Sequence, residues 1–138
     1  MYKTILVTLD GSRTDRAIIE HIKPLAKLMQ SRLVLLRVAT GVPSKYHKSD
    51  AAGQEVAEVE TYLGRVRDEF LALGIPTETV IAYGDPVKEI VGWVNRVGCD
   101  LVAMSTHGHQ FVADLVLGTT AINVQHSISV PVLLLRAR

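Results

Sequence analysis

Short apolar runs alternate along this chain with segments whose apolar residues recur every three or four positions. Runs of the first kind predict buried strands at Ile5–Val7, Leu33–Val38, Pro76–Tyr83, Leu101–Met104 and Pro131–Leu135. Segments of the second kind predict helices over Ile18–Met29, Val56–Leu73, Val87–Val97 and Thr119–His126. Strands that alternate with helical crossovers favour a mostly parallel sheet with helices on both faces. We therefore expect one α/β domain over residues 1–138, with the Thr-rich and Glu-containing run 76–83 at a sheet edge.

Composition agrees with this class and excludes several functions. Hydrophobic residues make up 48% of the chain and aromatic residues 5%, so the core must consist of Val, Ile, Leu and Ala. Fifteen basic residues face fourteen acidic ones, and a net charge of +1 gives no strong field to attract nucleic acid or anionic lipid. Residues 1–9 lack the features of a signal peptide, and no apolar run reaches the roughly 18 residues of a membrane span. We expect a cytoplasmic protein without nucleic-acid or membrane partners.

Polar and glycine residues follow three of the predicted strands, where open parallel sheets bind their ligands. The first strand ends at Asp10-Gly11-Ser12, the second at Val38-Ala39-Thr40, and the fourth at Ser105-Thr106-His107-Gly108. These segments should converge on one crevice. Ten residues after Gly108, Gly118-Thr119-Thr120 precedes the last helix, where backbone amides and two hydroxyls suit an anion. The sequence thus predicts a site for a phosphate-bearing ligand.

Each of these residues also has an ordinary structural interpretation. Asp10 could orient a ribose, yet Asp before Gly is common in turns, and Gly108 and Gly118 could be turn glycines. Two histidines, His107 and His109, suggest a metal site, but alternation along an extended segment would point them in opposite directions. We therefore expect no metal site, and His109 could instead contact a phosphate.

One spacing connects the chain to a known family. The signature Ser105-x-x-Gly108-x9-Gly118-Thr119, together with chain length and element order, resembles the universal stress protein family over essentially the whole chain. Nucleotide-binding members of that family carry Gly-x-x-Gly-x9-Gly-Ser/Thr after the fourth strand. The first glycine of this motif is replaced here by Ser105.

The resemblance implies a Rossmann-like sheet with strand order 3-2-1-4-5 and a regulatory or stress-response protein that binds ATP, ADP or AMP, alone or with Mg²⁺. By this resemblance Asp10 lies near the nucleotide, the backbone of Val38 meets adenine, and Thr119 and Thr120 lie beside the phosphates. The resemblance further implies a homodimer formed through the last strand, Val130–Arg136.

Two other functions stay open. Ser105 and the absence of Arg or Lys directly after Gly108 favour a dimeric interaction module of the same fold that binds no nucleotide. An ATP-using enzyme is the third alternative. No Walker motif, Ser-His-Asp order or paired-carboxylate motif occurs, so we expect no catalytic residues and no enzyme, although slow ATP hydrolysis is not excluded.

Overall fold

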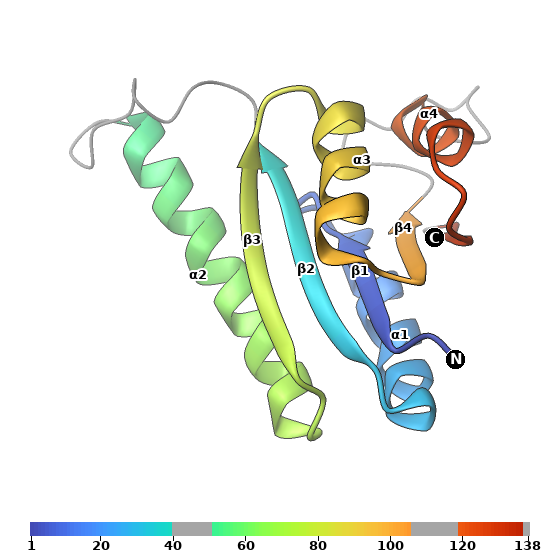
Figure 1. Ribbon diagram of the computed structural model, residues 1–138. Helices are drawn as coiled ribbons and strands as arrows, with labels where there is room; N and C mark the ends of the chain where they lie inside the picture. Colours follow the sequence, from blue (N-terminus) through green and yellow to red (C-terminus); the bar gives the residue numbers. More distant parts are fainter. Residues whose placement is uncertain (40–50, 106–118, 137–138) are drawn as a thin grey trace.

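Strands and helices alternate along the whole chain (Figure 1). The computed structural model describes residues 1–39, 51–105 and 119–136, without the side chains of residues 51–55 and 119. The strands are β1 (Thr4–Thr8), β2 (Arg32–Ala39), β3 (Thr77–Tyr83), β4 (Leu101–Ser105) and β5 (Val132–Leu135). The helices are α1 (Asp15–Met29), α2 (Ala51–Ala72), α3 (Pro86–Val97) and α4 (Thr119–Ser127). Each predicted element is present, with bounds shifted by a few residues.

The five strands form one parallel sheet in the order β3-β2-β1-β4-β5. This is the order implied by the family resemblance, and the edge position predicted for β3 is correct. Helices α1 and α2 cover one face of the sheet, and α3 and α4 cover the other (Figure 1). Because all strands are parallel, their carboxyl ends lie at one edge of the sheet.

Two hydrophobic clusters fill the space between the sheet and its helices. Alternate side chains of each strand point to opposite faces, so Ile5 and Val7 pack under α1 and α2, whereas Leu6 packs under α3 and α4. Phe70 of α2 is fully buried in the first cluster. The second contains Val94 of α3 and lacks buried aromatic rings among the described residues. As composition predicts, aliphatic side chains dominate both.

Both ends of α3 carry residues that ordinarily bound helices. The carboxylate of Asp85 accepts a hydrogen bond of 2.9 Å from the amide of Lys88, Pro86 occupies the first turn, and Gly98 ends the helix in the left-handed conformation. The start of α1 is not capped in this way. Thr14 occupies the N-cap position, but its side chain makes no capping hydrogen bond and instead contacts the hydroxyl of Ser12. The reason lies in the turn described below.

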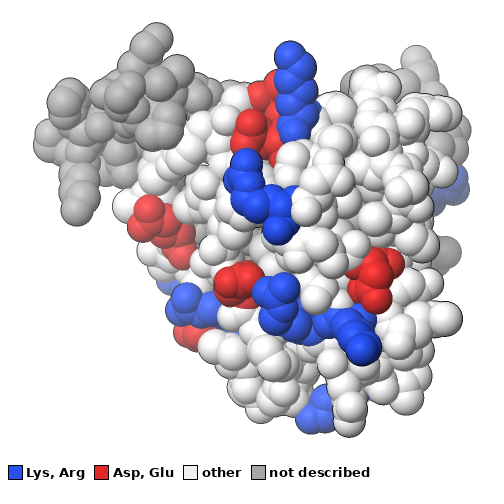
Figure 2. Space-filling model, in the orientation of Figure 1, with Lys and Arg blue, Asp and Glu red and all other residues white. Residues whose placement is uncertain are grey.

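The charged residues are dispersed. On the face in Figure 2, the coloured Lys and Arg side chains are interspersed with Asp and Glu. Within the described segments, none of the helices combines the length and apolar character needed to cross a lipid bilayer.

Candidate functional site

Three predicted site residues lie at the carboxyl edge of adjacent strands. Asp10 lies two residues after the end of β1, Val38 is the second-last residue of β2, and Ser105 ends β4. The ladders pair Thr8 with Leu36 and Val7 with Ala103, so the ends of β2 and β4 flank that of β1. The structure therefore brings Asp10, Val38 and Ser105 to one edge, as the sequence predicts.

The remaining predicted residues are only partly described. Helix α4 begins at Thr119, and Thr120 lies half-buried in its first turn. Four predicted positions, namely His107, Gly108, His109 and Gly118, lie outside the described residues. The predicted roles of all these residues stay predictions.

The turn after β1 is held by a dense set of hydrogen bonds. Asp10 accepts at its Oδ1 atom from the amide of Ser12 at 2.9 Å and from the Ser12 hydroxyl at 2.6 Å. Gly11 has a φ angle of +83°, a conformation that side-chain-bearing residues rarely adopt. The hydroxyl of Thr14 lies 2.6 Å from that of Ser12 and extends the network. The side chains that could have capped α1 are thus used to fix this turn.

Asp15, the first residue of α1, is almost fully buried at 2% exposure and accepts hydrogen bonds from the backbone of the same turn. Its Oδ1 atom accepts from the amide of Asp10 at 3.1 Å, and its Oδ2 atom accepts from the amide of Gly11 at 2.8 Å. The hydroxyl of Tyr62, from the middle of α2, donates to Oδ2 at 2.7 Å. A carboxylate from α1 therefore joins the β1–α1 turn to α2.

Arg37 of β2 completes the surroundings of Asp10. Its Nη1 atom donates to the backbone carbonyl of Asp10. Its Nε atom is buried and has no hydrogen-bond partner within the described part of the chain. The amide, the carbonyl and the carboxylate of Asp10 are thus each engaged, which fixes the position of this residue.

The two carboxylates of the turn have opposite electrostatic behaviour. Burial opposes ionisation of Asp10, but hydrogen bonds from Ser12 and the nearby Arg37 outweigh it and lower the pKa of Asp10. Burial dominates at Asp15 and raises its pKa to about 6, despite hydrogen bonds from Tyr62, Asp10 and Gly11. Burial and the hydrogen bond to Asp15 raise the pKa of Tyr62. At neutral pH, Asp10 is ionised and Asp15 is poised nearer to titration.

Sequence reasoning missed Asp15, Tyr62 and Arg37. Asp15 stands just before the apolar positions of α1, where an acidic residue is ordinarily explained by the helix dipole. The only signal for its burial would have been its place in the first turn, directly over the end of a buried strand. Tyr62 lies 47 residues from Asp15, so no local pattern relates them.

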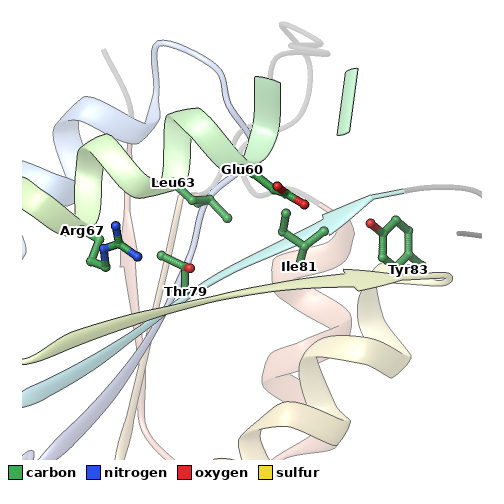
Figure 3. Close-up of a pocket in the computed structure, with 6 residues that line it drawn as sticks. All are labelled: Glu60, Leu63, Arg67, Thr79, Ile81 and Tyr83. Carbon is green, nitrogen blue, oxygen red and sulfur yellow. The ribbon is translucent and has the colours of Figure 1, made fainter. Parts of the chain in front are cut away.

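A separate groove of about 470 Å³ lies between α2 and β3 (Figure 3). Side chains from the helix face those of the edge strand across it. The lining residues are Glu60, Leu63, Arg67, Thr79, Ile81 and Tyr83. None of the predicted site residues belongs to it.

No group of three or more His, Cys, Asp or Glu side chains that could hold a metal ion occurs among the described residues. The histidine pair that suggested a metal hypothesis, His107 and His109, falls outside them.

Comparison with known proteins gives the family. The profile of the universal stress protein family matches residues 1–136. The chain belongs to the universal stress protein family. Universal stress protein MJ0577 of Methanocaldococcus jannaschii is 24% identical over 157 residues, which cover 100% of this chain and 97% of that protein.

Solved structures of the universal stress protein family agree in fold. The structure of MJ0577 has a TM-score of 0.88 at 25% identity and covers 100% of this chain and 98% of that one. A universal stress protein in complex with cAMP has a TM-score of 0.75 at 22% identity, and the match covers 99% of this chain and 98% of that one. The Archaeoglobus fulgidus protein in complex with dAMP has a TM-score of 0.71 at 15% identity and covers 96% and 97%. Two solved proteins of this family are thus complexes with nucleotides, one with cAMP and one with dAMP.

Proposed function

We propose that this protein is an adenine-nucleotide-binding regulatory protein of the stress response, which acts as a homodimer and is not an enzyme. The observation that carries the proposal is the convergence of Asp10, Val38 and Ser105 at one sheet edge, in a family with cAMP and dAMP complexes. Open parallel sheets bind ligands at this edge. The preferred nucleotide would be ATP, ADP or AMP.

The chemistry of each position suits a different part of the ligand. Ionised Asp10 would accept hydrogen bonds from ribose hydroxyls, since its lowered pKa keeps it charged at neutral pH. The half-buried end of β2 at Val38 would offer backbone groups and an apolar surface to adenine. The N-terminus of α4, with Thr120 in its first turn, would face the phosphates together with residues 105–118.

The proposed dimer would form through β5. This edge strand has one hydrogen-bonded neighbour, β4, and the side chains of Val132–Leu135 are half-buried although all four are apolar. An apolar edge strand leaves both backbone groups and hydrophobic area available for a second copy. The partial exposure of these apolar side chains supports the proposal, because a symmetric pair would bury them.

The first experiment is to identify small molecules released from the purified, denatured protein by mass spectrometry, followed by calorimetric titration with ATP and Mg²⁺. We expect bound adenine nucleotide or affinity near the micromolar range, about −8 kcal/mol. Gly118→Val should abolish binding because a side chain would obstruct the approach of a phosphate. Gly92→Val in α3 is the matched control, since a Cβ atom there meets nothing within 4 Å.

An empty protein with no heat of binding at millimolar ATP would refute the nucleotide proposal and favour the interaction module. Unchanged affinity in Gly118→Val would refute the phosphate-loop assignment alone. Incubation of bound ATP over hours tests the expectation that the protein is no enzyme, because sustained turnover would contradict it.

A further inference from the structure

The turn that carries Asp10 is joined to α2 by a single buried carboxylate. Asp15 accepts the amides of Asp10 and Gly11 on separate oxygens, and Tyr62 donates to one of those oxygens. Tyr62 itself packs against the core cluster under α1 and α2. Any change in the acceptor capacity of Asp15 therefore acts on the backbone next to the proposed ligand.

We propose that Asp15 and Tyr62 are positioning residues that set the Asp10–Ser12 turn and make its geometry, and with it nucleotide affinity, depend on proton binding at Asp15. This inference rests on the proposed function for its ligand and on the described contacts for its geometry. Neither residue touches the ligand directly in this proposal.

The charged groups around Asp15 come from four parts of the fold. The turn contributes the carboxylate of Asp10, and α2 contributes the hydroxyl of Tyr62. On α1, Arg16 lies next in the chain, but its guanidinium is paired with Glu20 and Glu69 at the surface. On β2, Arg37 binds the carbonyl of Asp10. None of the described cations forms an ion pair with Asp15, so burial keeps its ionisation near balance.

Protonation alters the hydrogen bonds that Asp15 can make. The ionised carboxylate is an acceptor only and serves three donors, whereas the acid form carries a donor of its own on one oxygen. That proton competes with the amide of Asp10, the amide of Gly11 or the hydroxyl of Tyr62. We expect the turn to be held firmly at alkaline pH and to loosen as pH falls through the pKa of Asp15, about 6.

The binding test compares ATP affinity at about pH 8 and about pH 5 in the wild type and in Asp15→Asn. Titration of ATP itself persists in the variant, so the difference between the two proteins reports Asp15. We expect the wild type to bind about tenfold more tightly than Asp15→Asn at the higher pH, the effect of one charged hydrogen bond, and about equally at the lower pH. An equal ratio at both values overturns the inference.

The matched control is Asp100→Asn. Asp100 also accepts two backbone amides with its carboxylate, those of Lys3 and Thr4, but at the opposite end of β1. Its replacement should leave the affinity ratio and its pH dependence unchanged. A pH effect as large as that of Asp15→Asn would show a general loss of structure and overturn the positioning role.

A second measurement needs no ligand. The amide resonance of Gly11 should titrate with the pKa of Asp15, about 6, and lose this titration in Asp15→Asn. Tyr62→Phe removes a donor to the ionised form, so its midpoint should move to higher pH, a shift that a purely structural role would not cause. A resonance that does not titrate overturns the inference whether or not ATP binds. Titration of Gly11 in a protein that binds no nucleotide would refute the proposed function while supporting the positioning of the turn.

Discussion

The buried carboxylate of Asp15 should make the stability of the fold fall as pH rises. Its pKa changes from an ordinary value of 3.8 to about 6 on folding. At roughly 1.4 kcal/mol for each pKa unit, a shift of about two units corresponds to about 3 kcal/mol. Because the folded state binds the proton more tightly, this stabilisation is complete below about pH 4 and is lost as pH rises through about 6.

Other carboxylates act in a lower pH range and with the opposite sign. Hydrogen bonds and charge from Arg16 and Lys23 lower the pKa of Glu69 to about 2, and the pKa of Asp10 is also lowered. Their stabilisation is present above their ordinary pKa values and is lost at acidic pH. The Glu69 side chain is 32% exposed, so solvent screening reduces its contribution. Between about pH 4.5 and about pH 6.5, Asp15 should therefore dominate the difference between wild type and variant.

The assay is urea unfolding of the wild type and Asp15→Asn across this pH range. We expect the free energy of unfolding of the wild type, relative to the variant, to decrease by about 2 kcal/mol as pH rises across this range, because part of the total of about 3 kcal/mol is already lost below about pH 4.5. Contributions from groups that are unchanged in the variant cancel in the difference. Asp100→Asn should keep the wild-type slope. If the free energies of unfolding of the wild type and Asp15→Asn changed with pH in parallel, the reasoning that burial raises the pKa of Asp15 would be refuted.

Three further predictions concern packing, capping and assembly. Phe70→Ala should lower the free energy of unfolding, measured by chemical denaturation, by about 3–5 kcal/mol, because the ring is fully buried. A smaller loss would mean that the surrounding side chains relax into the cavity. Asp85→Ala should cost about 1 kcal/mol through loss of the cap on α3, measured in the same way, with no effect expected of Lys88→Ala on that cap. Leu134→Glu should convert dimers to monomers by light scattering, with far-UV circular dichroism to verify the sheet, and a persistent dimer would move the interface away from β5.

Much of the fold followed from local patterns. The apolar run at Ile5–Val7 and the helical spacing from Ile18 onward predict elements because burial on one or two faces leaves a periodic trace. The polar residues of β3 identified it as an edge strand. Strand order was not available from periodicity and came only through the family resemblance, since the pattern is the same for several parallel orders.

Of the candidate site, the sequence predicted only what depends on strand ends. The shared position of Asp10, Val38 and Ser105 at one sheet edge was predicted because topology alone brings them together, and their roles stay predictions. Asp15 and Tyr62 were not, because their contact depends on how α2 packs beside α1, which involves tertiary geometry beyond any local pattern. The hydroxyl of Thr14, at the N-cap position of α1, makes no capping hydrogen bond because the network of the turn engages it instead.

The two edge strands of the sheet, β3 and β5, differ in chemistry, and this difference should limit the addition of further molecules to the sheet. A pair joined through β5 would leave a β3 strand at each outer end, where exposed Glu78 bonds Arg32 at 2.6 Å. A charged edge disfavours strand addition by a further molecule, so chains of sheets should not propagate into filaments. The same fold would thus permit association of two copies and oppose open-ended aggregation.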